Sequence, residues 1–226
     1  MARIIAKKGL GTMSGARKAE IGDRMVKRFP LYLRVLREMA AQGEPFASGA
    51  VVAKALALDP IVVRKDLSKT GVRGKPRVGF PLGEIILAIE RYLGWNASTE
   101  AVLAGAGRLG SALLGYPGFQ HQGFKIVAAF DVNPKKRGTI AGVPVYPASQ
   151  IADVVRQLNV SLGILTVPAD QAQAAADAMI AGGIRGLWNF TPVQLSVPSD
   201  VIVKREDLAA SLAVLSHRLR HGEKAK

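Results

Sequence analysis

A glycine-rich turn and the acidic residue that follows it have the types and spacing of a nucleotide-binding site. Gly105, Gly107 and Gly110 form a GxGxxG pattern, and Asp131 follows the third glycine by 21 residues. Such glycines let backbone N–H groups approach a pyrophosphate, and the acid accepts hydrogen bonds from the adenosine ribose hydroxyls. The alternative is that the glycines only allow a helix to pack closely on a strand. The predicted dinucleotide contacts are Gly105, Ala106, Gly107, Arg108, Leu109, Gly110 and Asp131.

The residues around this turn predict the strand–turn–helix–strand order that the site needs. Residues 100–104, apolar apart from Glu100, are a strand candidate, Ser111 begins a helical segment, and a second apolar stretch ends at Asp131. Further apolar strands alternate with helices after that point, near 143–146, 162–167, 184–190 and 201–203. This alternation is typical of a parallel α/β sheet and predicts a Rossmann-like domain.

Two later strands end in residues that would face the same ligand. Open parallel sheets bind ligands at the carboxyl ends of their strands. We expect the residues at these two strand ends to contact the ribose or nicotinamide part of the cofactor: Thr166, Val167, Pro168, Asn189 and Phe190. The competing interpretation is that the prolines there only close loops.

The net charge of +14 is concentrated in the first third of the chain. Residues 1–80 hold 17 Lys and Arg against 6 Asp and Glu, whereas residues 81–226 hold 14 against 11. A charge concentrated in one segment favours a polyanion partner over general solubility, although a solvated basic surface is the alternative.

Several kinds of site are excluded by composition. The chain has no cysteine, which excludes disulfides, zinc–thiolate sites and iron–sulfur clusters. His121, His217 and His221 are its three histidines, at unrelated positions, so we expect no metal centre. We find no run of eighteen apolar residues and no N-terminal signal pattern, and we therefore expect a cytoplasmic protein without a membrane span.

The basic segment has the signals of a helix-turn-helix. Ser48 is a predicted N-cap, and Asp59 followed by Pro60 predicts the start of another helix about three residues after the previous one ends. On that last helix we expect Ile61, Val62 and Leu67 to face inward. The predicted DNA-reading side chains, which face outward into the major groove, are Arg64, Lys65, Ser68 and Lys69.

The next stretch, residues 72–80, alternates cations with turn residues. This pattern predicts the wing of a winged helix, a hairpin whose basic tip contacts the DNA backbone or minor groove. Its predicted DNA contacts are Arg73, Lys75 and Arg77. The alternative for the whole basic segment is a helical domain whose solvated cationic side contacts another protein.

The order of these segments resembles the Rex family of redox-sensing transcriptional repressors. The resemblance covers nearly the whole chain past about residue 24 and rests on eight motifs: LYLR at 31–34, VRKDLS at 63–68, GAGRLGSA at 105–112, YPGF at 116–119, FDVNP at 130–134, LTVP at 165–168, NFTP at 189–192 and EDL at 206–208. It implies a non-enzymatic homodimer that compares NADH with NAD+ and leaves its double-stranded operator DNA when NADH binds.

The resemblance also implies a switch. Arg34 of one chain would pair with Asp207 of the other in the DNA-bound state, and NADH would rearrange Tyr116 and break that pair. Tyr116 would therefore belong to the cofactor site as well. Leu208 stands where many members carry a phenylalanine that covers the nicotinamide pocket, and the wing sequence also departs from the family.

The predicted fold class is α/β, with four segments: a basic flexible arm over 1–23, a winged helix-turn-helix DNA-binding domain over 24–82, a Rossmann-like parallel sheet domain over 83–204 and a C-terminal domain-swapped helix and tail over 205–226. A periodic stripe of leucines on that last helix supports docking on its own domain or on a second subunit.

Two other functions stay open at this point. An NAD(P)-dependent oxidoreductase shares the Rossmann-like architecture, but no histidine or lysine near the two strand ends offers a general acid or base. A regulator could also respond to coenzyme A or another adenine nucleotide. Asp131 favours NAD over NADP, whereas the nearby Lys135, Lys136 and Arg137 could meet a 2′-phosphate.

Overall fold

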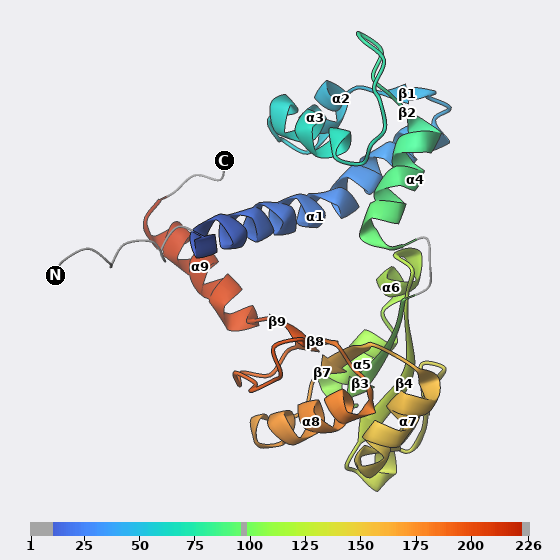
Figure 1. The fold of residues 1–226 in the computed structure, drawn as a ribbon, viewed down its shortest axis with the longest axis vertical. Helices are drawn as coiled ribbons and strands as arrows, with labels where there is room; N and C mark the ends of the chain where they lie inside the picture. Colours follow the sequence, from blue (N-terminus) through green and yellow to red (C-terminus); the bar gives the residue numbers. More distant parts are fainter. Residues whose placement is uncertain (1–10, 96–98, 223–226) are drawn as a thin grey trace, which may run out of the picture. The chain divides into compact units, whose positions relative to one another are not determined.

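The chain folds into two compact units, which are drawn in Figure 1. The computed structural model describes residues 11–95 and 99–222, with side chains from Arg24 onward except that of His121. The units are Met1–Ala97 and Ser98–Lys226. The predicted boundary after residue 82 is therefore wrong. Helix α4 (Leu82–Leu93) belongs to the first unit, because its buried residues, Leu82, Ile85 and Ile89 among them, pack into the core of that unit.

The first unit is built mainly of helices. Besides α4, its elements are α1 (Gly11–Ala41), α2 (Gly49–Ala55), α3 (Pro60–Ser68), β1 (Phe46–Ala47) and β2 (Phe80–Pro81). Strands β1 and β2 pair antiparallel. Several of the unit's large core side chains, among them Phe29, Tyr32 and Leu36, come from α1 and are fully buried.

Helix α1 begins earlier than the sequence predicted. The expectation was a flexible arm through residue 23, but the helix begins at Gly11 and contains Pro30. A proline removes one backbone hydrogen bond from a helix. Met25 and Phe29, which precede Pro30, are nevertheless buried in the core, and such tertiary packing supports a helix that continues through the proline. Residues 1–10 of the predicted arm lie outside the described residues.

The second unit contains a seven-stranded, mostly parallel sheet. In spatial order its strands are β5 (Gly138–Ile140), β6 (Val143–Pro147), β4 (Phe124–Asp131), β3 (Thr99–Ala104), β7 (Leu162–Leu165), β8 (Gly186–Asn189) and β9 (Ile202–Arg205). The pairing is parallel throughout except between β5 and β6. The predicted strand–turn–helix–strand order around the glycine turn is confirmed.

Helices cover both faces of this sheet. Val102 and Ala104 of β3 pack in one core with residues of α7 (Ile151–Leu158) and α8 (Ala172–Gly182). Ala101 and Leu103, which alternate with them, pack in a second core with residues of α5 (Arg108–Leu114) and α6 (Pro117–His121). Short 3₁₀ helices occur at Pro134–Lys136, Ala148–Gln150 and Ala169–Gln171.

The last helix, α9 (Leu208–Arg220), has no buried residue. The leucine stripe expected from the sequence is present but exposed: Leu208, Leu212, Leu215 and Leu219. This helix therefore does not dock on its own unit. No helix in the described parts of the chain is long and apolar enough to cross a membrane.

Candidate functional site

The glycine turn leaves β3 at the carboxyl edge of the sheet and leads into α5. Gly105 has a φ of +97°, and its N–H donates to the carbonyl oxygen of Phe130 at 2.8 Å. A Cβ on Gly105 would lie 2.7 Å from the carbonyl carbon of Thr166, and a Cβ on Gly110 would collide with the carbonyl oxygen of Gly105. The fold itself therefore requires glycine at both positions.

Gly107 differs from these two glycines. Its φ of −70° and ψ of −161° are open to any residue. Apart from Gly107 and its chain neighbours, no atom of the described residues lies within 4 Å of an added Cβ. Gly107 lines a cavity at the edge of the sheet. Its missing side chain leaves room beside that cavity, which the close approach of a pyrophosphate to the backbone needs.

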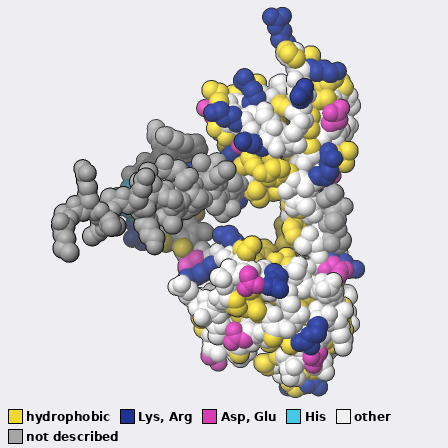
Figure 2. Space-filling model, viewed as in Figure 1, with side chains coloured by type: hydrophobic (Ala, Val, Ile, Leu, Met, Phe, Trp, Pro, Cys, Tyr) yellow, Lys and Arg dark blue, Asp and Glu magenta, His cyan; other side chains and the backbone are white. Residues whose placement is uncertain are grey.

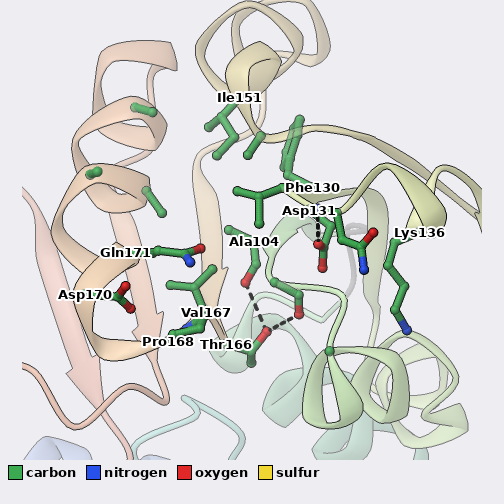
Figure 3. A pocket seen from close by; sticks show the side chains of 18 residues that line it. Ala104, Phe130, Asp131, Lys136, Ile151, Thr166, Val167, Pro168, Asp170 and Gln171 are labelled. Carbon is green, nitrogen blue, oxygen red and sulfur yellow. Dashed lines mark hydrogen bonds between the residues drawn. The ribbon is translucent and has the colours of Figure 1, made fainter.

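The Thr166 side chain holds the turn against the next strand. Its hydroxyl lies 3.0 Å from the carbonyl oxygen of Ala104 and 2.8 Å from that of Gly105, and donates between them. Figure 3 shows both contacts beside the cavity. Thr166 thus lines the site and also fixes the geometry of the glycine turn.

The cavity has a volume of about 490 Å³, which is within the range of small-molecule sites. One wall is apolar and consists of side chains from α7, α8 and the turn before α7: Ala148, Ile151, Ala174, Ala175 and Ala178. Such a wall suits the faces of a nucleotide base. Polar side chains lie at both sides of the site in Figure 3, with Asp131 and Lys136 on one side and Asp170 and Gln171 on the other.

Asp131 ends β4 within this cavity. Its Oδ1 accepts a hydrogen bond from the backbone N–H of Asn133 at 2.8 Å, which fixes the carboxylate. Among the residues that the structure describes, no hydrogen bond reaches Oδ2. The carboxylate can therefore accept hydrogen bonds from ribose hydroxyls.

The structure brings most, but not all, of the predicted cofactor residues together. Six of them line the cavity: Gly105, Gly107, Asp131, Thr166, Val167 and Pro168. Four others complete the turn and the start of α5 without lining it: Ala106, Arg108, Leu109 and Gly110. Asn189, Phe190 and Tyr116 lie outside this cavity.

The Asn189 amide is fully used within its own loop. The side chain is buried, its Nδ2 donates to the carbonyl oxygen of Val193 at 2.9 Å, and its Oδ1 accepts from both the N–H and the hydroxyl of Thr191. Asn189 therefore shapes the loop after β8 rather than presenting an amide to a ligand.

Tyr116 and Phe190 lie at the two ends of a chain of aromatic rings, which the sequence reasoning did not find. The ring centroids are 5.0 Å apart between Tyr116 and Phe119, 6.0 Å between Phe119 and Trp188, and 4.6 Å between Trp188 and Phe190. Trp188 Nε1 also donates to the carboxylate of Glu206 at 3.2 Å. The rings thus connect the segment after α5 with the segment before α9.

The predicted switch residues are exposed. Asp207 is the N-cap of α9: its Oδ1 accepts from the N–H of Ala210 at 2.9 Å, and its other oxygen lies 3.9 Å from the Arg205 guanidinium. Leu208 is the next residue and is 67% exposed. Arg34 is exposed on α1 of the first unit, and half of the Tyr116 side chain is exposed in the second.

Helices α2 and α3 form the predicted helix-turn-helix, and both predicted caps are confirmed. Ser48 Oγ accepts from the N–H of Val51, and Asp59 Oδ1 accepts from that of Ile61. The predicted outward-facing residues of α3 are exposed: Arg64, Lys65, Ser68 and Lys69. The prediction that Ile61 faces inward is wrong, because Val63 occupies the core and Ile61 is exposed.

The segment between α3 and β2 forms the predicted hairpin. Lys75 and Gly79 form an antiparallel bridge, and Gly79 has a φ of +117°. A Cβ on Gly79 would clash with the backbone of Ala47, so the return strand packs closely on the residues before α2. The cations Arg73, Lys75 and Arg77 are exposed, and Figure 2 shows Lys and Arg side chains at the hairpin tip.

A charged cluster beneath α3 was not anticipated. Asp66, only 6% exposed, accepts two hydrogen bonds from the Arg28 guanidinium, at 2.7 and 2.9 Å, and one from the Tyr32 hydroxyl at 2.7 Å. Burial, together with the bond to Asp66, raises the pKa of Tyr32 to about 12. The hydrogen bonds to Asp66 also raise the pKa of Arg28. Within the described residues, no group of His, Asp and Glu side chains could hold a metal ion.

A helix-turn-helix with a basic hairpin and a Rossmann-like unit with a nucleotide cavity together define a DNA-binding regulator with a nucleotide-sensing domain. Comparison with known proteins agrees. Residues 20–68 match the family "Putative DNA-binding protein N-terminus", and residues 96–193 match "CoA binding domain". The chain is 44% identical over 191 residues to the redox-sensing transcriptional repressor Rex of Treponema denticola, covering 84% of this chain and 91% of that protein.

Other relatives extend this agreement. Identity to Rex of Bacteroides fragilis is 38% over 205 residues, covering 90% of this chain and 93% of that one. The crystal structure of RSP, a Rex-family repressor, with β-NAD+ and operator DNA has a TM-score of 0.82 and 31% identity, covering 88% and 93% of the two chains. The chain therefore belongs to the Rex family of redox-sensing transcriptional repressors, and the predicted winged-helix and Rossmann-like fold class is confirmed.

Proposed function

We propose that this protein represses transcription by binding operator DNA when NADH is scarce, and that NADH bound beside the glycine turn releases it. The observation that carries the proposal is a single cavity that combines the open position at Gly107 with the carboxylate of Asp131. RSP has been crystallised with β-NADH and, separately, with β-NAD+ and operator DNA. Membership of a family of repressors supports a regulator over the oxidoreductase alternative.

From the lining of the cavity we infer positions for three parts of a dinucleotide. The pyrophosphate would lie at Gly107, the adenosine ribose at Asp131, and the base against the apolar wall between α7 and α8. Thr166, Val167 and Pro168 would contact the remainder of the cofactor. In this proposal Asn189 and Phe190 support the site by shaping the segment after β8.

Coenzyme A is the alternative ligand, because residues 96–193 match a CoA binding domain family. Calorimetric titration with NADH, NADPH and coenzyme A separates the possibilities. We expect NADH to bind best and Asp131→Ala to weaken it at least tenfold, since the ribose hydroxyls lose their acceptor. Lys136→Ala should weaken the binding of NADPH more than that of NADH, because the lysine could meet a 2′-phosphate, which NADH lacks. Tighter binding of coenzyme A than of NADH would contradict the assignment.

The proposed DNA surface is the exposed side of α3 with the hairpin. Arg64, Lys65, Ser68 and Lys69 would enter the major groove, and Arg73, Lys75 and Arg77 would contact the backbone or minor groove. The Ser68 hydroxyl donates to the Arg64 carbonyl oxygen at 2.7 Å, so it would meet DNA as an acceptor. Because several cations would contact phosphates, the affinity for DNA should fall steeply as the salt concentration rises.

Coupling between the nucleotide cavity and the proposed DNA surface would need a second copy of the chain. Helix α9 has an exposed leucine stripe and no buried residue, which supports its docking on a partner subunit as a swapped helix. Asp207, at the start of that helix, would then pair with Arg34 of the partner in the DNA-bound dimer. NADH bound in the cavity would rearrange Tyr116, which lies outside it, and would thereby disfavour this pair. A dimer also has the twofold symmetry of paired operator half-sites.

The sensing step requires NADH to favour the released dimer more than NAD+ does, because a ligand shifts an equilibrium only by its differential affinity. An apolar nicotinamide site would penalise the positive ring of NAD+. The test is a gel shift of operator complex at varied NADH to NAD+ ratio. Release of the operator by NADH but not by the same concentration of NAD+ supports the proposal. Unchanged occupancy of the operator at saturating NADH contradicts it. A repressor of this kind would work in the cytoplasm, where the operator is.

A further inference from the structure

Ile61 lies at the centre of the exposed face of α3. Successive residues of a helix are turned by about 100°. Relative to Ile61, Arg64 is therefore turned by about 60° to one side and Lys65 by about 40° to the other, while Ser68 follows about two turns along the same face. All four are exposed, and Ile61 is 57% exposed. The apolar side chain is thus flanked by two cations.

The fold gives no reason for an isoleucine at this position. The buried side of α3 consists of Val63, Asp66 and Leu67, and Ile61 is not part of the core of the first unit. A single exposed apolar side chain normally carries no information. Ile61, however, is in the first turn of the helix that the proposed function places in the major groove, where N-terminal residues contact base edges.

We propose that Ile61 contacts the methyl group of a thymine and gives the operator a required thymine in each half-site. This inference rests on the proposed binding of DNA through α3. In the major groove only thymine presents a methyl group, and apolar side chains recognise it, whereas Arg and Lys contact guanine or phosphate. Arg64 and Lys65 on either side would hold the isoleucine against the bases.

The test removes that methyl group alone. An operator is first selected with the protein from a randomised duplex pool, and each thymine is then replaced in turn by deoxyuridine. We expect one position per half-site at which the replacement weakens binding about fourfold, the effect of one buried methyl group. Ile61→Ala should lower affinity for the thymine operator and abolish the difference between thymine and deoxyuridine. Ile61→Val should keep the difference.

Val51→Ala is the matched control, since Val51 is an apolar side chain of α2 that is 47% exposed. This variant should keep the full difference between thymine and deoxyuridine. The proposal is overturned if no replacement changes wild-type affinity, or if Ile61→Ala retains the difference. Arg64→Ala separates this failure from failure of the proposed DNA surface: unchanged operator affinity in that variant would show that α3 does not read the DNA at all.

Discussion

The Arg28 guanidinium and the Asp66 carboxylate are joined by two hydrogen bonds, of 2.7 and 2.9 Å, which connect α1 to the buried side of α3. Tyr32, one turn after Arg28 on α1, donates a third hydrogen bond to the same carboxylate. Asp66 directly follows the exposed Lys65 on α3. The cluster therefore fixes the rotation of α3 about its axis, and with it the direction in which the proposed DNA contacts point.

Asp66→Asn should destabilise the first unit and weaken operator binding while NADH binding stays normal. Removing one partner of a largely buried ion pair leaves an uncompensated charge, and we expect a loss of about 3 kcal/mol in the free energy of unfolding. Urea unfolding can follow the first unit alone in a Trp188→Phe background. The chain has two tryptophans, and the remaining one, Trp95, packs against that unit's core.

The control for this prediction is Asp153→Asn in the second unit. Asp153 pairs with Arg156 at 3.0 Å, but both side chains are more than half exposed, and exposed pairs contribute little to stability. Operator affinity in this variant should equal that of the wild type. Wild-type stability in Asp66→Asn would show that the cluster does not hold α3 in place.

The wild type should lose stability at alkaline pH because Tyr32 ionises, and the Tyr32→Phe variant should lack this loss. The pKa of Tyr32 is about 12 in the folded protein, above the ordinary tyrosine value of about 10. Between these values the folded state holds more protons than the unfolded state, so the stabilisation is complete below pH ~10 and is lost as the pH rises through ~12. The difference in unfolding free energy between wild type and variant should therefore shrink over this range. A constant difference from pH 8 to 12 would argue against the raised pKa.

The Arg28–Asp66 contact could not be read from the sequence. Asp66 lies in a run of charged residues, and charged residues are normally exposed, so nothing in the sequence marked it as buried. Periodicity indicates which face of a helix is buried but not which residue of a distant helix it meets. The same limit explains why Ile61 was expected to face inward and Val63 was not. The two are only two residues apart, and a small change in helical phase decides which of them is buried.

The nucleotide site was more predictable because its determinants are local. The turn, its flanking strands and Asp131 follow from backbone geometry within one strand–turn–helix–strand unit. The role of Asn189 was not predictable, since its hydrogen bonds to Thr191 and Val193 depend on the loop conformation. The start of α1 was missed because Pro30 removes a backbone hydrogen bond and argues against a continuous helix, whereas the burial of Phe29 beside it depends on tertiary packing.

Gly107→Ala and Gly110→Ala should separate ligand binding from folding. At Gly107 the added Cβ meets no protein atom within 4 Å, so we expect wild-type stability and a loss of NADH affinity of tenfold or more. At Gly110 the Cβ collides with the backbone of Gly105, so we expect a lowered melting temperature. Calorimetric titration and thermal unfolding of both variants provide the check. Normal NADH binding by the Gly107→Ala variant would show that the pyrophosphate does not lie at the glycine turn.

Asp207→Ala should weaken operator binding although Asp207 is not among the proposed DNA contacts. In the proposed dimer it pairs with Arg34 of the partner, but it also caps α9 through the N–H of Ala210. Asp207→Ser separates the two roles, because serine keeps a capping oxygen and lacks the charge. If the ion pair matters, operator affinity should fall in both variants, as it should in Arg34→Ala. If only the cap matters, Asp207→Ser should bind operator like the wild type.

Charge reversal provides the decisive comparison for this pair. Arg34→Asp and Asp207→Arg should each lower operator affinity, because each leaves two like charges facing one another in the DNA-bound dimer. The double variant restores opposite charges, so a direct pair predicts recovery of most of the lost affinity, and NADH should still release the complex. Additive losses in the double variant would mean that the two residues do not meet.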